Sequence, residues 1–83
     1  MGREWFLKCL EEALSKRANE KFTVKNLLID TGAKDPTTKL VENVENRFRY
    51  YVMLNESVHF EMFCNKNQLI FVRLTDFYGF DDI

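Results

Sequence analysis

The sequence predicts an α+β fold, with two or three N-terminal helices packed on a C-terminal three-stranded antiparallel β-meander. Three observations support this prediction. Apolar residues recur at helical spacing near the N-terminus, and an Asp-Pro pair marks the start of a later helix. Runs rich in Phe, Tyr and Val, separated by turn-type residues, then predict three strands: Arg47–Leu54, Val58–Cys64 and Gln68–Leu74.

The segment Arg3–Arg17 is expected to form the first helix, because its apolar residues fall on one broad face and its charged residues on the other. The pairs Glu4–Lys8 and Glu12–Lys16 are four residues apart in the favourable order, which adds about a few tenths of a kcal/mol each. The apolar face consists of Trp5, Phe6, Cys9, Leu10, Ala13 and Leu14.

A short second helix is expected over Val24–Thr31. Thr23 can cap its N-terminus, and Phe22 and Leu27 have the spacing of a hydrophobic staple. Gly32 stands where a helix C-terminus favours a left-handed residue. A strand over Phe22–Ile29 is the alternative, because the run is short and contains β-branched residues.

The third helix is expected to start at Asp35-Pro36, with the aspartate as N-cap and the proline at the first helical position. It would continue to about Arg47. The apolar residues that it would bury are Leu40, Val41, Val44 and Phe48.

The predicted sheet has apolar residues on both faces, so it needs two covers. Strand alternation places one set on the first face: Phe48, Tyr50, Val52, Leu54, Val58, Phe60, Met62 and Cys64, with Ile70, Val72 and Leu74. The second face then holds Arg49, Tyr51, Met53, His59, Glu61, Phe63, Leu69, Phe71 and Arg73. Only one obvious cover is present in the chain.

The chain of 83 residues is expected to be a single domain. Its predicted parts are a helical part (1–46), an antiparallel sheet (47–75) and an acidic aromatic tail (76–83). The tail places Phe77, Tyr78 and Phe80 among Asp76, Asp81 and Asp82.

Composition argues against several classes of protein. The net charge is −1 and no run of Lys or Arg forms a basic patch, which disfavours nucleic-acid binding. The two cysteines are too few for a disulfide scaffold, and no signal-peptide core or membrane-spanning run is present in the sequence. We therefore expect a cytoplasmic protein with reduced thiols and no membrane partner.

No catalytic or metal-binding motif is found. His59 is the single histidine, and neither Cys9 nor Cys64 has the paired spacing of a zinc site. On a regular strand, Cys64 and His59 would lie on opposite faces, out of hydrogen-bond reach. Ser57 lies in a turn without a third orienting group. We expect no enzymatic activity, no metal and no cofactor, with His59 beside Glu61 and both cysteines buried.

The order of the elements resembles that of a winged helix-turn-helix. On this interpretation Val24–Thr31 is the first helix of the motif, Gly32–Asp35 is the turn and Val58–Leu74 is the wing. Thr37, Thr38 and Lys39 would then face the major groove. The resemblance implies a DNA-binding transcriptional regulator, although Glu42 and Glu45 leave the recognition helix with little net positive charge.

A protein partner fits the second sheet face better than nucleic acid does. Aromatic residues and Arg are enriched at interface hot spots, whereas Glu61 and the acidic tail would repel phosphates. The predicted interface is Arg49, Tyr51, Phe63, Phe71, Arg73, Phe77, Tyr78 and Phe80. The alternative is that the tail or the third helix covers this face.

The function that the sequence favours is a small non-enzymatic protein-binding module that acts as a stoichiometric regulator or inhibitor. Its partner would be another protein or a second copy in a homodimer. Frequent Asn, Lys and Phe with few Ala, Gly and Pro indicate an AT-rich coding source, a composition typical of phage and mobile-element inhibitors. The alternative is the winged helix-turn-helix regulator.

Overall fold

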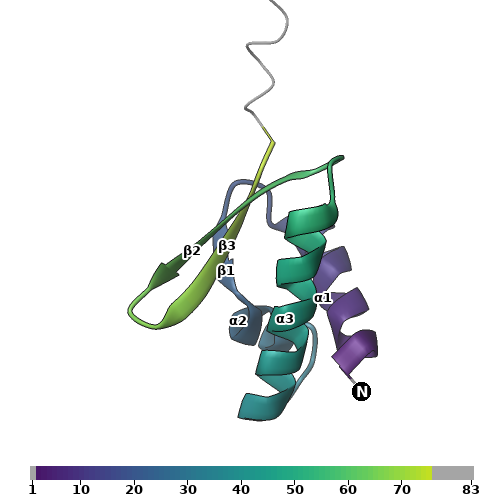
Figure 1. Cartoon of the computed structure of the whole chain (residues 1–83). Helices are drawn as coiled ribbons and strands as arrows, with labels where there is room; N and C mark the ends of the chain where they lie inside the picture. The colour runs from purple at the N-terminus through teal and green to yellow at the C-terminus, as the bar shows by residue number, and fades with distance from the viewer. Residues whose placement is uncertain (1, 76–83) are drawn as a thin grey trace, which may run out of the picture.

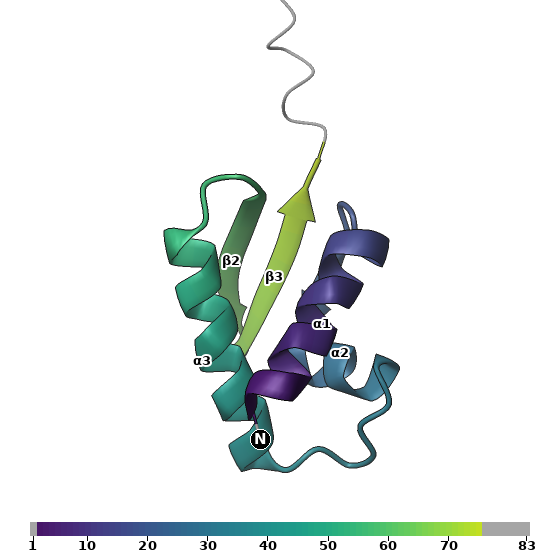
Figure 2. The same ribbon diagram turned by 90° about the vertical axis from the view of Figure 1, so that its right-hand side faces the viewer.

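The computed structural model describes residues 2–75. Along this range the elements are α1 (Gly2–Lys16), β1 (Lys21–Thr23), α2 (Val24–Asp30), α3 (Thr38–Leu54), β2 (His59–Asn65) and β3 (Gln68–Leu74). The three helices lie on one side of the three-stranded antiparallel sheet (Figures 1 and 2). The predicted α+β fold class is therefore confirmed.

The first two helices form where the sequence predicts them. In α2, the Thr23 hydroxyl accepts a hydrogen bond from the Asn26 amide at 3.2 Å, which satisfies one of the free amides at the helix start. Phe22 and Leu27 are both buried, as expected of a hydrophobic staple. Gly32 follows the helix with φ +112°, a backbone conformation that favours glycine.

The third helix starts later than the sequence predicts. Asp35 has φ +46° and is not the N-cap. Thr37 takes that role instead, and its hydroxyl accepts a hydrogen bond from the Leu40 amide at 3.1 Å. Pro36 therefore lies just before the cap rather than in the first helical turn.

The prediction of a strand at Arg47–Leu54 is wrong, because α3 continues through all eight of these residues. High β-propensity is overruled here by burial. Val44 and Phe48 are completely buried at a spacing of four residues, and the partly buried Tyr51 and Val52 extend the same helical stripe. No Gly or Pro interrupts the segment. The predicted boundary between a helical part (1–46) and a sheet part (47–75) is wrong for the same reason.

The third strand of the sheet is β1, so the strand order is β1-β3-β2 rather than that of a meander. Residues 22–29 thus contain both alternatives, a short strand followed by a helix. The turn between β2 and β3 has Lys66 and Asn67 at φ +53° and +65°, as in a type I′ hairpin. Both hairpin strands lie within about one residue of their predicted bounds.

The register of β3 places Phe71 on the helix side of the sheet. Phe71 pairs with Phe22 of β1 and Met62 of β2, and paired residues point to the same face. Its ring stacks on that of Phe22 at 5.9 Å between centroids. The prediction that placed Leu69, Phe71 and Arg73 on the same sheet face as Phe63 is therefore wrong. The alternation of β3 is shifted by one residue relative to the predicted pattern.

The other side of the sheet carries Phe63, Ile70, Val72 and Leu74, together with Lys21, Thr23, His59 and Glu61. Within residues 2–75 no helix covers this side (Figure 2). We call it the outer sheet face. The sequence correctly predicts that one face of the sheet has no cover among the helices.

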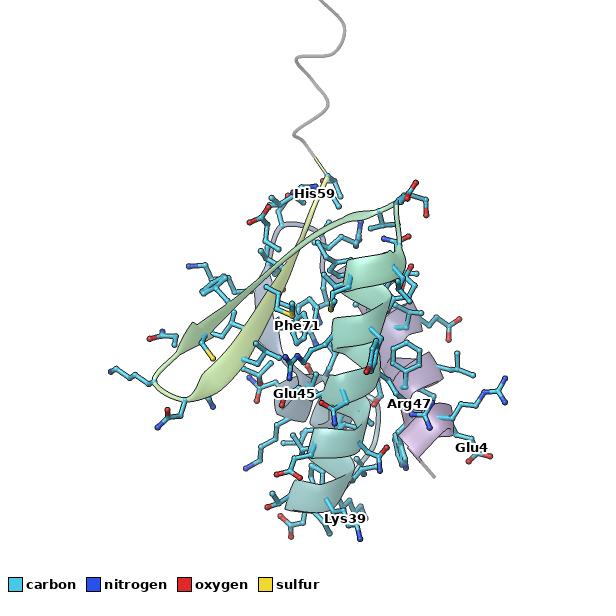
Figure 3. All side chains as sticks on the ribbon, in the orientation of Figure 1. Glu4, Lys39, Glu45, Arg47, His59 and Phe71 are labelled. Atoms are coloured by element: carbon cyan, nitrogen blue, oxygen red, sulfur yellow. The ribbon has the colours of Figure 1, made fainter. Side chains whose placement is uncertain are left out.

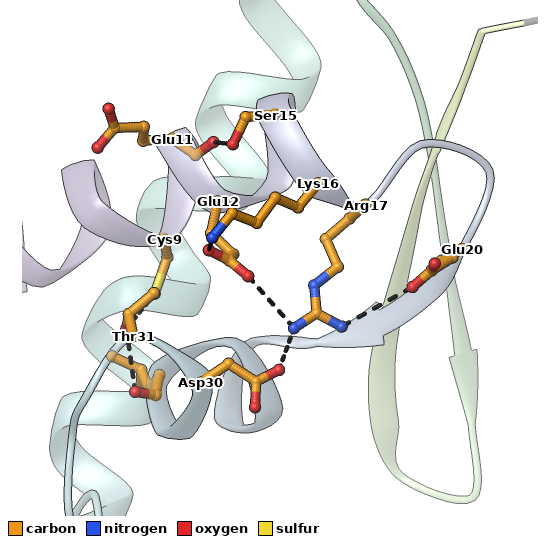
Figure 4. Close-up of polar contacts among 10 residues, drawn as sticks. Cys9, Glu11, Glu12, Ser15, Lys16, Arg17, Glu20, Asp30 and Thr31 are labelled. Carbon is orange, nitrogen blue, oxygen red and sulfur yellow. Dashed lines mark hydrogen bonds and ion pairs between the residues drawn. The ribbon is translucent and has the colours of Figure 1, made fainter.

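A polar cluster joins α1 to α2 around the Arg17 guanidinium (Figure 4). This group contacts the carboxylates of Glu12, Asp30 and Glu20. Because the cation is shared among three acids from different elements, its evident role is to fix the position of α2 against the end of α1.

Candidate functional site

The eight residues predicted to form an interface do not form one surface. Arg49 and Tyr51 lie on α3, Phe63 lies on the outer sheet face, and Phe71 is completely buried (Figure 3). Phe77, Tyr78 and Phe80 lie outside the described residues. The predicted grouping fails because it treats part of α3 as a strand and assigns Phe71 to the wrong face.

Tyr51 and Arg73 have structural roles. The Tyr51 ring lies edge-on against Phe60 at 5.9 Å and against Phe6 at 6.4 Å, so it joins α1 and α3 to the sheet. The Arg73 Nε donates a hydrogen bond to the Ala13 carbonyl at 2.9 Å, near the C-terminal end of α1. Neither side chain faces away from the helices to meet a partner.

Phe63, which was predicted to be an interface residue, does lie on the sheet face that no described helix covers. Its side chain is 39% exposed on the outer sheet face, and the Lys21 ammonium lies 5.6 Å from the ring centroid. This cation–π contact covers one side of the ring.

The largest exposed apolar side chains of α3 lie in its C-terminal half. Tyr50 is 66% exposed, Met53 is 68% exposed and Leu54 is 77% exposed. Positions three and four apart lie on one side of a helix, so these side chains neighbour exposed polar groups of the same helix. We define the α3 surface as Asn46, Arg47, Arg49, Tyr50, Met53 and Leu54.

Two shallow hollows flank Tyr50 on this surface. One has a volume of about 420 Å³ and is lined by Asn46, Arg49, Tyr50 and Met53. The second, of about 550 Å³, reaches toward α1 and is lined by Phe6, Arg47, Tyr50, Tyr51, Leu54 and Asn55. Both are open to solvent, so they suit the side chains of a macromolecular partner better than an enclosed small molecule.

The charged groups of the surface are basic. Arg47 and Arg49 form no ion pair with another residue of the range 2–75. Glu45, the nearest acid along the helix, is partly buried, and burial raises the pKa of its carboxyl group, opposed by the nearby Arg49 cation. An acidic partner would therefore pair with Arg47 and share Arg49 with Glu45.

Sequence reasoning missed Tyr50 and Leu54 as exposed residues, and it placed Met53 on the second sheet face without including it in the predicted interface. It placed Tyr50 and Leu54 on a core face because it assumed the alternation of a strand. The available signal was helical: Asn46, Arg49, Tyr50 and Met53 follow an i, i+3, i+4, i+7 pattern.

Ser57 and His59, the candidate catalytic residues, each contact another side chain. The Ser57 hydroxyl hydrogen-bonds to the Asn55 side-chain oxygen at 2.8 Å, whereas the His59 Nε2 lies 2.9 Å from a Glu61 carboxylate oxygen. His59 therefore lies beside Glu61, as predicted. Among residues 2–75 no group of three His, Cys, Asp or Glu side chains is arranged to hold a metal ion.

The two cysteines differ in exposure. Cys9 is buried, and burial raises the pKa of its thiol from 9.0 to about 11 despite a contact with the Thr31 hydroxyl. A thiol with so high a pKa is a poor nucleophile at neutral pH. Cys64 is exposed near the hairpin turn, so the prediction that both thiols are buried is wrong for Cys64.

Over the described range no helix has both the length and the hydropathy that crossing a bilayer requires. Comparison with models of known protein families, with curated proteins and with solved structures finds no match.

Proposed function

We propose that this protein is a non-enzymatic protein-binding module that acts as a stoichiometric regulator or inhibitor, and that it binds through the α3 surface. One observation carries the proposal: Tyr50, Met53 and Leu54 are each at least 66% exposed on the solvent side of one helix. Large apolar side chains gathered in this way mark interaction sites on proteins.

The residue types of the α3 surface also fit a protein partner. Tyr and Arg dominate interface hot spots, and Met is enriched at binding surfaces because its flexible side chain adapts to different shapes. The hollows beside Tyr50 can receive apolar side chains from the partner. Arg47 and Arg49 supply charge that fixes orientation.

Exposed substitutions on α3 test the proposal without disturbing the core. Tagged wild-type protein and the double variant Met53→Asp/Leu54→Asp are used to capture proteins from a lysate, followed by mass spectrometry. Leu7→Asp on α1 is the matched control, because Leu7 is also exposed, at 51%. We expect one protein to be retained by the wild type and by Leu7→Asp, and lost by the double variant.

The recovered partner must then bind the purified chain at a fixed ratio in calorimetry. If all three proteins retain the same partner equally, the α3 surface is not the interface. If the only protein retained is a second copy of this chain, light scattering of the purified protein distinguishes a homodimer from a monomer.

The second candidate function is DNA binding, and the topology favours it. The order α2, turn, α3 and β2–β3 hairpin, with β1 completing the sheet, agrees with the winged helix-turn-helix resemblance. Thr38 and Lys39 are exposed at the start of α3. Lys39 is labelled in Figure 3. Duplex binding that is sequence-selective, weakens steeply with salt and is lost in Lys39→Glu would favour this function over the first.

We infer a cytoplasmic location and a phage or mobile-element source. Cys9 and Cys64 are both free thiols, which supports a reducing compartment. The composition described above supports the source. Fractionation of the producing cells would test the location.

A further inference from the structure

The side chains of the α3 surface suit an occupant of a particular chemistry. Its apolar groups, Tyr50, Met53 and Leu54, lie beside Arg47 and Arg49, which form no ion pair within residues 2–75, although the Glu45 carboxyl interacts with the Arg49 cation. An occupant that combines aromatic side chains with carboxylates would fill the hollows and pair with the arginines at the same time.

The chain itself contains such a segment. Residues 76–83 have the sequence DFYGFDDI, in which aromatic residues and aspartates are interleaved and no basic residue occurs. We propose that the α3 surface binds the segment Asp76–Ile83 of the same chain, and that a protein partner must displace this segment to bind.

The connection is short enough for binding within one chain. Leu74, the last residue of β3, pairs with His59, and α3 ends five positions before His59, at Leu54. Both ends lie at the same end of the molecule (Figures 1 and 2). Leu54 therefore lies within about 17 Å of His59 along the connecting chain, and an extended segment of eight residues spans about 26–29 Å.

Charge favours the α3 surface over the outer sheet face as the binding site. The outer sheet face contains Glu61, which would repel the aspartates, and its Lys21 already lies over the Phe63 ring. The α3 surface offers Arg47 and Arg49, which form no ion pair within residues 2–75.

Binding within one chain has a regulatory consequence. A segment tethered this closely has an effective concentration in the millimolar range, so even weak contacts keep the surface occupied for part of the time. A partner then binds with an affinity reduced by that occupied fraction. This consequence rests on the proposed function, whereas binding of the segment needs no second protein and is tested without one.

The test is NMR of the full chain with labelled methionine methyl groups, which reports on Met53 at the α3 surface and on Met62 as an internal reference beside the core. We expect nuclear Overhauser effects between the Met53 methyl and the rings of Phe77, Tyr78 or Phe80. In the full-chain variant Phe77→Ser/Phe80→Ser, the Met53 resonance should shift and Met62 should not. Arg49→Glu should shift Met53 in the same direction.

Three results would overturn the inference. One is the absence of any contact between the segment and Met53. Another is contact of its rings with Ile70 or Leu74, which would place it on the outer sheet face. The third is a Met53 shift that depends on protein concentration, with contacts between differently labelled chains, which would make a second copy the occupant. The first two results do not affect the proposed function, whereas the third would make a second copy of the chain the partner at the α3 surface.

Discussion

The ring of Phe48 in α3 packs against the ring of Phe71 in β3, with centroids 5.5 Å apart, and neither side chain is exposed to solvent. This contact joins the longest helix to the central strand. Because Phe22, Phe48 and Phe71 also contact one another pairwise, the three rings form the centre of the core.

Truncation of Phe71 should destabilise the fold severely. Phe71→Ala removes a completely buried ring and is expected to lower the free energy of unfolding by about 3–5 kcal/mol, measured by urea denaturation. Phe63→Ala is the matched control on the same sheet, and its loss should be much smaller because Phe63 is 39% exposed. If Phe71→Ala leaves no folded protein, Phe71→Leu allows the comparison. Equal losses at the two positions would contradict the register of β3.

Two substitutions test the start of α3. Thr37→Ala should lower stability by about 1 kcal/mol, because it leaves the Leu40 amide without its partner. Asp35→Gly should raise stability, because Asp35 has φ +46°, which glycine adopts at lower energy. Thermal unfolding followed by circular dichroism measures both. A loss of stability in Asp35→Gly would indicate that Asp35 is the N-cap after all.

Substitutions in the hairpin turn should stabilise the protein. Lys66 and Asn67 both have positive φ, the conformation in which an Asn-Gly pair is favoured. The double variant Lys66→Asn/Asn67→Gly should therefore raise the free energy of unfolding by about 1 kcal/mol in urea denaturation. Asn65→Gly is the control, since Asn65 lies within β2, where glycine should destabilise the strand. A gain from Asn65→Gly as well would mean that the turn is displaced.

The thiols should differ in reactivity and in pH dependence. A water-soluble maleimide should label Cys64 in the folded protein and leave Cys9 unlabelled. The pKa of Cys9 is about 11 in the folded state against an ordinary value of 9.0, so the unfolded chain loses this proton first as the pH rises. The Cys9 contribution to stability should therefore fall between about pH 9 and about pH 11.

The variant Cys9→Ala isolates this contribution, because every other titrating group is shared. Its free energy of unfolding should approach that of the wild type as the pH rises through this interval. A constant difference between the two proteins would show that Cys9 titrates alike in the folded and unfolded states.

Much of the fold could be predicted from local sequence signals. The amphipathic period of α1, the Thr23 cap of α2 and the hairpin strands all depend on residues close in sequence, and each was confirmed. Whether residues 47–54 form a strand or a helix depends instead on a tertiary contact. Tyr and Val in this segment favour a strand locally, but burial of Phe48 against Phe71 stabilises the helix.

The candidate site was harder to predict for the same reason. Whether Tyr50 points into the core or into solvent depends only on whether its backbone has the period of a strand or of a helix. Once one element is misassigned, every side chain on it is placed on the wrong face. The identity of Lys21–Thr23 as a strand could not be predicted either, because three residues carry no periodicity and their pairing partner is distant.

The pairing of β1 with β3 also constrains the order of folding. Lys21 pairs with Val72, so this ladder closes a loop of roughly fifty residues, whereas the hairpin closes over two. During synthesis, α1, β1 and α2 emerge well before the strand that completes their core. Until β3 arrives, Phe22 and Phe48 lack the Phe71 ring, and the helical half exposes its apolar face. Docking of the hairpin onto the preassembled helices is thus the step that we expect to limit the folding rate.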